Sequence, residues 1–305
     1  MPHHPALDPH AILKALGVGA VHSLTPVNTG TATAVWRVEH DQVTSALRVF
    51  RPDQAPISLR ELEAMALATR HHIPVPQVRG QGYWQDCPAL LLAWCDGQPL
   101  ATALQRQPWR LFRLGRAFGQ MQAKIHRIPA PALADPSSAD WLTWYGAVDP
   151  GLEAVLRSRC GHVRQLIHLD YHPLNVMVNR GHVSGVLDWA NVRAGDPRGD
   201  VARTYAILVV EPHSAGPETL WYRAARRILA RVWMAGYRNV AGPLQDMALF
   251  FAWAGAVMQA DLAPRLHDPN SWWQPRHMGI VQHWTQHWRK RAEDLNPLPA
   301  GDGPR

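Results

Sequence analysis

The most informative stretch of this 305-residue chain covers residues 168–200 and reads HLDYHPLNVMVNRGHVSGVLDWANVRAGDPRGD. Asp170 is followed five residues later by Asn175 and, thirteen residues after that, by Asp188. A phosphoryl-transfer site needs one carboxylate to orient a hydroxyl group, and an amide and a second carboxylate to hold magnesium. These three side chains supply that set, so we interpret the stretch as a phosphoryl-transfer site.

Short hydrophobic runs in this stretch predict a loop followed by a β-hairpin. Pro173 disfavours a helix, so the segment before the hairpin is predicted to be a loop on a rigid base. Residues 176–178 and 183–187 predict two strands joined by a glycine-containing turn. Asp188 follows the second strand, so we expect the hairpin to bring Asn175 and Asp188 to the same rim.

Other interpretations of single residues stay open. An Asp or an Asn beside a proline often only caps a turn, although this explains all three residues at these spacings poorly. The pattern His168-x-Asp170-x-His172 also permits a zinc site, which leaves no role for Asp188. Asp200 opens a predicted helix, where a carboxylate suits the helix N-terminus.

Three motifs resemble those of the aminoglycoside phosphotransferase/choline kinase-like family: HLDYHPLN at residues 168–175, LDW at residues 187–189 and GDPRGDVA at residues 195–202. In that family the motifs read roughly His-Gly-Asp-x-His-x-x-Asn, then Asp-Trp or Asp-Phe, then Gly-Asp-Pro-x-x-Asp-Leu-Ala. The resemblance covers roughly residues 22–255 and is sharp over residues 168–202.

This resemblance implies an α+β, bilobal protein-kinase-like fold, with a small β-rich N-lobe that contains one helix and a larger, mainly helical C-lobe. We expect the nucleotide-binding lobe at residues 1–95 and the helical lobe, with the substrate site, at residues 96–305. The implied roles are catalysis for Asp170 and magnesium coordination for Asn175 and Asp188. His168 and His172 are expected to fix the loop rather than to react.

The nucleotide side of a kinase needs a cation on the phosphates. In the segment SALRVF the position where the family carries Lys is occupied by Arg48, which can bind phosphate oxygens bidentately but is not equivalent to Lys. Its expected partner on the following helix is Glu61, with Glu63 as the second choice and solvated helix charges as the alternative for both.

Weaker signals mark the rest of the nucleotide site. Asn28, Thr29 and Gly30 lie in a segment whose backbone amides are expected to cover phosphate, although it is not a Gly-x-Gly-x-x-Gly loop. Trp94 and Cys95 are expected to form the hinge beside the adenine through backbone groups, so their identity carries little information.

The rest of the chain predicts a mixed fold. A short helix is expected from Asp8-Pro9 to Gly17. The predicted strands and helices follow in this order: strands at 35–38 and 43–50 around a turn at 39–42, a helix at 59–70 with Leu59 in its apolar stripe, strands at 77–82 and 89–94, a helix at 109–126, a loop or short helices at 129–151, and an all-helical region at 199–295.

Composition narrows the class of partner. The net charge of +7 permits nucleic acid or a membrane surface, but only 18% of residues are charged and no long Lys/Arg run occurs. An anionic nucleotide suffices as partner, so we expect no membrane partner and disfavour nucleic acid. The apolar run at 247–258 is expected to be a buried helix too short to cross a bilayer.

Cysteine usage and the N-terminal sequence predict a cytoplasmic protein. Cys87, Cys95 and Cys160 are odd in number and form no Cys-x-x-Cys motif, as expected for thiols in a reducing compartment. The first residues show no charged segment followed by an apolar one, so no signal peptide is predicted.

We therefore expect a small-molecule kinase that uses ATP (or GTP) and Mg2+ to phosphorylate a hydroxyl-bearing acceptor. The alternative is a nucleotide-binding or interaction protein without phosphotransfer. It is suggested by Arg48 in place of Lys and by the weak phosphate-binding signal around Gly30. The acceptor and the oligomeric state cannot be read from the sequence. Asp246, Asp261 and Asp268 are candidates for an acidic cleft, with solvated surface charges as the alternative.

Overall fold

The computed structural model describes residues 7–27, 33–133, 140–146, 148–160, 163–210, 219–268, 271 and 273–295. Contacts group the chain into two units, residues 1–99 with 176–191 and residues 100–175 with 192–305. The sequence predicts a single division at residue 95. In the structure, the hairpin that follows Asn175 also belongs to the N-terminal unit.

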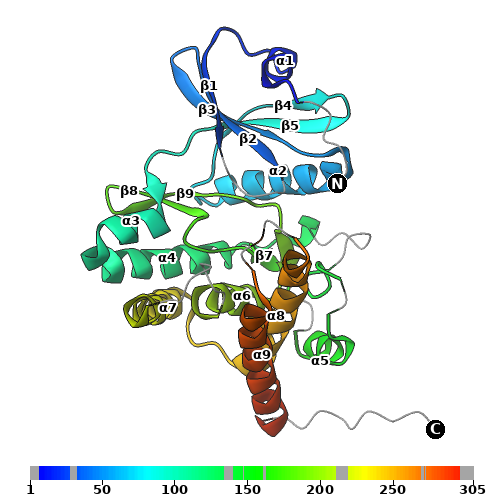
Figure 1. Cartoon of the computed structure of the whole chain (residues 1–305), viewed down its shortest axis with the longest axis vertical. Helices are drawn as coiled ribbons and strands as arrows, with labels where there is room; N and C mark the ends of the chain where they lie inside the picture. The colour runs from blue at the N-terminus through cyan, green and yellow to red at the C-terminus, as the bar shows by residue number, and fades with distance from the viewer. Residues whose placement is uncertain are drawn as a thin grey trace, which may run out of the picture. The chain divides into compact units, whose positions relative to one another are not determined.

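A five-stranded antiparallel sheet forms the centre of the first unit, in the order β1-β2-β3-β5-β4 (Figure 1). The strands are β1 (Val21–Val27), β2 (Ala34–His40), β3 (Val43–Val49), β4 (Val78–Trp84) and β5 (Cys87–Ala93). Positive φ angles at Asp41 and Gln42, and at Gln85 and Asp86, mark the two tight hairpin turns. The predicted strand pairs are confirmed, and β1 is a further strand that we had not predicted separately.

Two helices pack against this sheet. Helix α1 (Pro9–Ala15) begins at Asp8, whose carboxylate accepts hydrogen bonds from two backbone N–H groups as predicted for an N-cap. Ile12 and Leu13 of α1 join Leu47 and Val49 of β3 in one hydrophobic cluster. Because side chains alternate along a strand, Arg48 faces the opposite side of the sheet.

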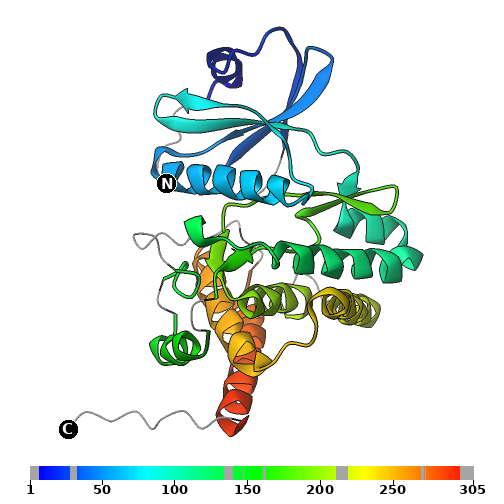
Figure 2. The ribbon, with the colours of Figure 1, turned by 180° about the vertical axis from the view of Figure 1, so that it is seen from behind.

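Helix α2 (Ala55–Arg70) buries only part of the predicted apolar stripe. Its buried positions are Ser58, Glu61, Ala64, Met65 and Ala68, whereas Leu59 is 53% exposed. The stripe was therefore wrong at Leu59, while Met65 and Ala68, which continue it, are buried as predicted beside the charged side chain of Glu61. Figure 2 shows α2 running along the sheet from the other side.

Three short strands complete the first unit as a second sheet in the order β6-β8-β9. These are β6 (Gln98–Pro99), β8 (Val176–Asn179) and β9 (His182–Val186). The predicted hairpin is confirmed, with Val176 opposite Val186.

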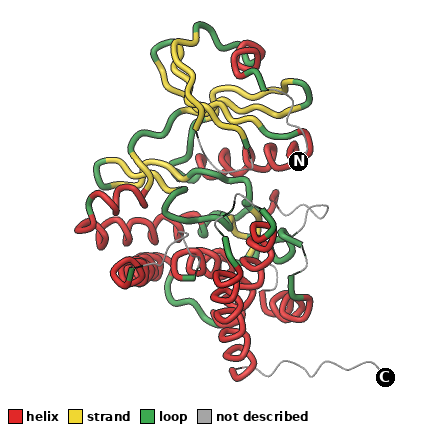
Figure 3. Tube along the Cα trace, viewed as in Figure 1, coloured by secondary structure: helices red, strands yellow, loops and turns green. Residues whose placement is uncertain are grey.

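The second unit is mainly helical (Figure 3). Its helices are α3 (Leu100–Arg106), α4 (Leu111–Ile125), α5 (Pro150–Cys160), α6 (Pro197–Val209), α7 (Leu220–Ala241), α8 (Met247–Leu262) and α9 (Pro275–Leu295), and its strands are β7 (Gln165–Ile167) and β10 (Arg193–Gly195). The helical segments predicted at 109–126 and 199–295 are confirmed. The strands β7 and β10, each three residues long, pair antiparallel and had no sequence signal that we recognised.

Helix α8 is the centre of the hydrophobic core of this unit. Trp253 on α8 contacts Trp141, which also stacks on Phe250. With the turn that follows it, the helix runs over Met247–Leu266 and is long and apolar enough to cross a membrane, so our expectation about its length was wrong. However, 61% of that window is buried inside the protein, as in a core helix.

Helices α4 and α7 approach closely because each contributes a glycine. A Cβ atom added at Gly119 would lie within 3 Å of the backbone of Trp233, and one added at Gly236 would meet the backbone of Arg116. This close contact fixes the side chains of α4, two of which, Gln122 and His126, bind Asp200 of α6.

Candidate active site

Hydrogen bonds to Asp200 of α6 hold the loop that carries Asp170 in place. The carboxylate of Asp200 accepts hydrogen bonds from the backbone N–H groups of His168 (3.1 Å) and Leu169 (2.7 Å). Leu169 has a φ of 62°, which a non-glycine residue adopts only when its surroundings impose it. The backbone directly before Asp170 is therefore set by α6.

Two side chains of α4 also bind Asp200. His126 Nε2 lies 2.8 Å from the carboxylate, and Gln122 donates to it at 3.2 Å. Burial alone would raise the pKa of Asp200, but hydrogen bonding from His126 outweighs it and lowers the pKa. Asp200 is structural and lies in the first turn of α6, as expected, whereas the N-cap of the helix is Asp196, which accepts from the N–H of Arg198.

Asp170 and Asn175 lie side by side within the loop. The amide nitrogen of Asn175 donates to the Asp170 carbonyl oxygen at 3.0 Å and to its carboxylate at 3.2 Å. Among the described residues, the amide oxygen of Asn175 accepts no hydrogen bond, so it is left for another partner. His172 Nε2 lies 3.5 Å from the carboxylate of Asp170, and Nδ1 accepts from the N–H of Leu174.

Asp170 is a partly exposed carboxylate whose pKa is lowered. Its side chain is 26% exposed. Burial acts to raise its pKa, but the imidazoles of His172 and His168 and the guanidinium of Arg203 outweigh burial and hold the pKa at about 2. The group is therefore available to accept a hydrogen bond from a hydroxyl at any working pH.

Arg48 is the centre of an ion-pair cluster in the first unit. Its Nη1 lies 2.6 Å from Glu61 and its Nη2 lies 2.9 Å from Asp188, while Nε donates to the hydroxyl of Thr33 at 3.2 Å. Burial acts to lower the pKa of Arg48, but the two carboxylates outweigh it and raise the pKa. Glu63, the second choice from the sequence, is exposed on α2.

Glu61 is fully buried in this cluster. Burial raises its pKa to about 7, even though Arg48 acts in the opposite direction. One carboxylate oxygen accepts from Arg48 and from the N–H of Trp189, whereas the other has no partner among the described residues. An orphaned buried oxygen disfavours the charged form of this group.

Asp188 has an unusual backbone and a free oxygen. Its φ is 60°, its side chain is 42% exposed, and the oxygen not bound by Arg48 accepts nothing among the described residues. Magnesium uses oxygen ligands, takes few of them from protein and leaves the rest to water and phosphate. The free oxygen of Asn175 and the free oxygen of Asp188 are each of the kind that such an ion binds. The described ranges contain no group of three His, Cys, Asp or Glu side chains that would make the alternative zinc site.

The segment that is expected to form the hinge, around Trp94 and Cys95, is bound to β9. Ser184 donates to the carbonyl of Asp96 at 2.7 Å, and Gly185 lies against the sulfur of Cys95. The N–H of Trp94 donates to the carbonyl of Thr44, so that N–H is already engaged. The expected phosphate cover at Asn28, Thr29 and Gly30 lies outside the described residues.

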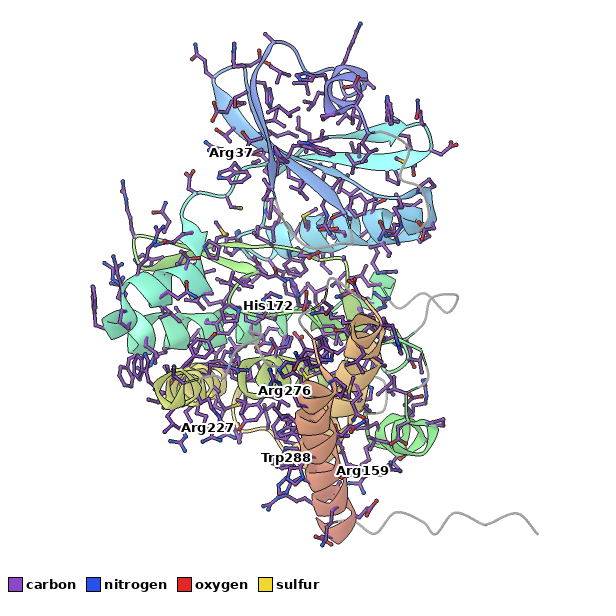
Figure 4. The ribbon with its side chains drawn as sticks, viewed as in Figure 1. Arg37, Arg159, His172, Arg227, Arg276 and Trp288 are labelled. Carbon is purple, nitrogen blue, oxygen red and sulfur yellow. The ribbon has the colours of Figure 1, made fainter. Side chains whose placement is uncertain are left out.

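Sequence reasoning missed Arg203, a buried residue on α6. It follows Asp200 by one helical turn on the same face of the helix, but this spacing alone does not distinguish it from a solvated charge. Figure 4 shows the side chains, with His172 of the loop labelled.

The two units together have the protein-kinase-like fold, as predicted. They are similar to a thermostable mutant of aminoglycoside phosphotransferase APH(4)-Ia in a ternary complex with ADP and hygromycin B (TM-score 0.64, 15% identity, covering 91% of this chain and 97% of that one). They are also similar to the amicoumacin kinase hAmiN in complex with AMP-PNP, Ca2+ and Ami (TM-score 0.63, 14% identity, covering 96% and 95%).

The family model of the phosphotransferase enzyme family matches residues 23–243, and the chain belongs to this family. The predicted family and enzyme class are thereby confirmed. A curated relative, hygromycin-B 4-O-kinase of Escherichia coli, is 30% identical over 81 residues, which make up 24% of this chain and 24% of that protein. The chain therefore matches about a quarter of the length of this relative.

Proposed function

We propose that this protein transfers the γ-phosphate of ATP to a hydroxyl group of a small molecule. Asp170 orients the acceptor hydroxyl and receives its proton, Asn175 and Asp188 bind Mg2+, and Arg48, positioned by Glu61, binds phosphate oxygens. Backbone groups at Asn28, Thr29 and Gly30 and at Trp94 and Cys95 are proposed to contact the nucleotide.

The observation that carries this proposal is the arrangement of Asn175. Its amide nitrogen is held by Asp170, which leaves its oxygen available for a cation next to the residue that handles the hydroxyl. A loop with a purely structural role would not need an ionised carboxylate, on Asp170, beside an unbonded amide oxygen, on Asn175. When bound, Mg2+ neutralises charge that develops on the phosphate oxygens.

The low pKa of Asp170 defines its part in the reaction. A carboxylate with a pKa of about 2 is a weak base, so it orients the hydroxyl and takes the proton late, after the oxygen has begun to bond to phosphorus. This suits a loose transition state, in which positioning matters more than strong base catalysis.

Arg48 retains capacity for phosphate. A guanidinium has five N–H groups, and three nitrogens of Arg48 each donate one of them to Thr33, Glu61 or Asp188. The second N–H groups of Nη1 and Nη2 are left for phosphate oxygens. The departure from lysine is therefore compatible with nucleotide binding.

The proposal is tested by ADP release with ATP, Mg2+ and a panel of hydroxyl compounds that includes hygromycin B and amicoumacin. Asp170→Asn is expected to lower kcat by about 100-fold or more while the Kd for AMP-PNP stays unchanged. Asp86→Asn, in an exposed turn, serves as the matched control. Equal turnover in wild type and Asp170→Asn would remove Asp170 from the mechanism, and nucleotide binding without ADP release would favour the non-catalytic alternative.

The metal ligands are tested separately with Mn2+ in place of Mg2+. Asn175→Ala and Asp188→Ala are each expected to weaken Mn2+ binding in the presence of AMP-PNP, measured by electron paramagnetic resonance. Unchanged binding in either variant would exclude that residue. We also propose a cytoplasmic location, where ATP is available and the three free thiols stay reduced.

A further inference from the structure

Arg203 of α6 is buried without the hydrogen bonds that a buried guanidinium needs. It is 3% exposed, and its Nε and Nη1 atoms have no hydrogen-bond partner among the described residues. Its Nη2 lies 3.8 Å from Asp261, which is too long for a hydrogen bond. A buried charge whose donors are unmet is costly, and two of the three guanidinium nitrogens are unused here.

Trp144, Asp261 and Tyr145 surround the guanidinium of Arg203 with further polar groups. The guanidinium lies 6.0 Å from the ring centre of Trp144, whose buried indole N–H is also unpartnered among the described residues. The hydroxyl of Tyr145 is hydrogen-bonded to Asp261, and burial followed by that carboxylate raises the pKa of Tyr145 to about 12. The unused groups at this place are all N–H donors, and Asp261 is already bound.

Arg203 belongs to the helix face that holds the catalytic loop. Asp200 accepts from the backbone of His168 and Leu169, and the hydroxyl of Thr204 donates to the carbonyl of Tyr171 at 3.0 Å. Residues 200, 203 and 204 share one face of α6, because residues three and four positions apart are neighbours on a helix. Arg203 therefore lies beside the loop that presents Asp170.

We propose that Arg203, with the indole N–H of Trp144, binds an anionic oxygen of the acceptor, and that the acceptor is a hydroxy compound carrying a carboxylate or a similar oxyanion. This inference rests on the proposed function, which supplies the hydroxyl transfer at Asp170. Charge-assisted hydrogen bonds to a planar guanidinium favour oxyanions over neutral groups and exclude cations.

Two of the three acidic residues considered for a polycationic acceptor are already engaged by neighbouring side chains. Asp246 is paired with Arg198 at 3.9 Å, and Asp261 is shared by Arg203 and Tyr145. A polycation at this place would meet a buried guanidinium whose ion-pair partner, Asp261, is already engaged. The charges around the loop thus favour an acceptor with a negative group near its reacting hydroxyl.

The test measures binding of matched probes to the full chain loaded with AMP-PNP. The probes are sugar acids and their primary amides, such as D-gluconate with D-gluconamide and D-glucuronate with D-glucuronamide, and kanamycin serves as a polycation. In wild type, at least one acid is expected to bind about tenfold or more tightly than its amide by calorimetry.

Three variants separate a binding role from a structural one. Arg203→Gln is expected to abolish the preference for the acid, and Asp261→Asn is expected to increase it by removing the competing carboxylate. Arg227→Gln, at an exposed arginine labelled on α7 in Figure 4, is expected to leave it unchanged. If Arg203→Gln does not fold, Asp261→Asn still tests the role of Arg203, because only that role predicts a stronger preference for the acid over its amide in this variant.

The outcomes are distinguishable from failure of the proposed function, because binding is measured without turnover. Acids that bind no better than their amides in wild type, or a preference that survives Arg203→Gln, overturn the role of Arg203. A preference for acids that depends on Arg203, in a protein that never releases ADP, retains the site and rejects the kinase activity.

Discussion

Arg48 shows how one residue can organise a site through geometry as well as charge. Its planar fork donates to Thr33, Glu61 and Asp188 in three directions. A lysine ammonium is a compact point charge and cannot reproduce this fixed fork. Substituting one basic residue for the other is therefore not conservative at this position.

We predict that Arg48→Lys lowers kcat/KM for ATP by about tenfold, because it loses at least one charge-assisted hydrogen bond, and that Arg48→Met lowers it by about 100-fold or more. Steady-state kinetics with varied ATP would measure this, and Arg51→Lys, in an exposed pair with Asp53, is the control. An Arg48→Lys enzyme that matches wild type would show that only the charge matters.

Glu61 is predicted to control the pH dependence of the nucleotide site. Its folded-state pKa of about 7 lies above the ordinary value of 4.5, so its contribution to stability is complete below the ordinary value and is lost as the pH rises through 7. Activity changes in the opposite direction, because only ionised Glu61 forms the ion pair with Arg48. Asp170, with a pKa of about 2, stays ionised throughout.

We therefore expect kcat/KM for ATP to rise between about pH 5.5 and pH 8 while the contribution of Glu61 to stability falls. Rate profiles and unfolding midpoints across this range would follow both effects. In Glu61→Gln the acid limb of the rate profile should disappear, with low activity at every pH. An unchanged acid limb in that variant would assign the titration to another group.

At the scale of elements, helix α6 connects the buried core to the loop that carries Asp170. Every identified partner of the Asp200 carboxylate is a donor: two backbone N–H groups, the imidazole of His126 and the amide of Gln122. An asparagine here would direct an NH2 group at some of these donors. The acid is therefore required for its acceptor capacity and not only for its charge.

We predict that Asp200→Asn lowers the free energy of unfolding by about 3 kcal/mol or more, because buried donors lose their acceptor. Chemical denaturation would measure the loss, and hydrogen exchange at the N–H groups of His168 and Leu169 would show whether the loop loosens. Asp86→Asn is the matched substitution at an exposed turn. A loss below 1 kcal/mol would show that Asp200 is dispensable to the loop.

The sequence predicted those elements whose determinants are local. The turns at Asp41 and Gly181 and the N-cap at Asp8 depend on neighbouring residues and were identified correctly. The stripe of α2 was wrong only at Leu59, because burial of Glu61 in that part of the helix depends on Arg48, a partner from another strand. The pair β7–β10 was missed because its three-residue strands depend on packing between distant segments.

The residues of the candidate site were predictable only where their pattern is local in the sequence. Asp170, Asn175 and Asp188 stand out because their spacing is visible within one short stretch. Arg203 could not be recognised in this way, since its meaning depends on Asp261 and Trp144, which are far away in the chain. Polar residues whose partners are remote in sequence have no local pattern that distinguishes them from solvated charges.

At the scale of the whole molecule, the first unit is completed by residues that lie far downstream. Residues 176–191 supply β8, β9 and Asp188, and the N–H of Trp189 binds Glu61. Without them, Arg48 loses one carboxylate and Glu61 loses a donor in a buried position. Residues 1–99 alone should therefore be incomplete as a folding unit.

We predict that a fragment of residues 1–99 does not fold, whereas the same fragment joined to residues 176–191 does. Pro99 lies opposite Met177 in the antiparallel pair of β6 and β8, so a linker of about four Gly/Ser residues can connect residue 99 to residue 176. Far-UV circular dichroism should show a cooperative thermal transition for the fusion and none for residues 1–99. A fusion with Glu61→Ala provides the matched test, because it should lose stability if the buried pair with Arg48 is what completes the unit. Cooperative unfolding of the 1–99 fragment by itself would show that the hairpin is attached to a unit that is already complete.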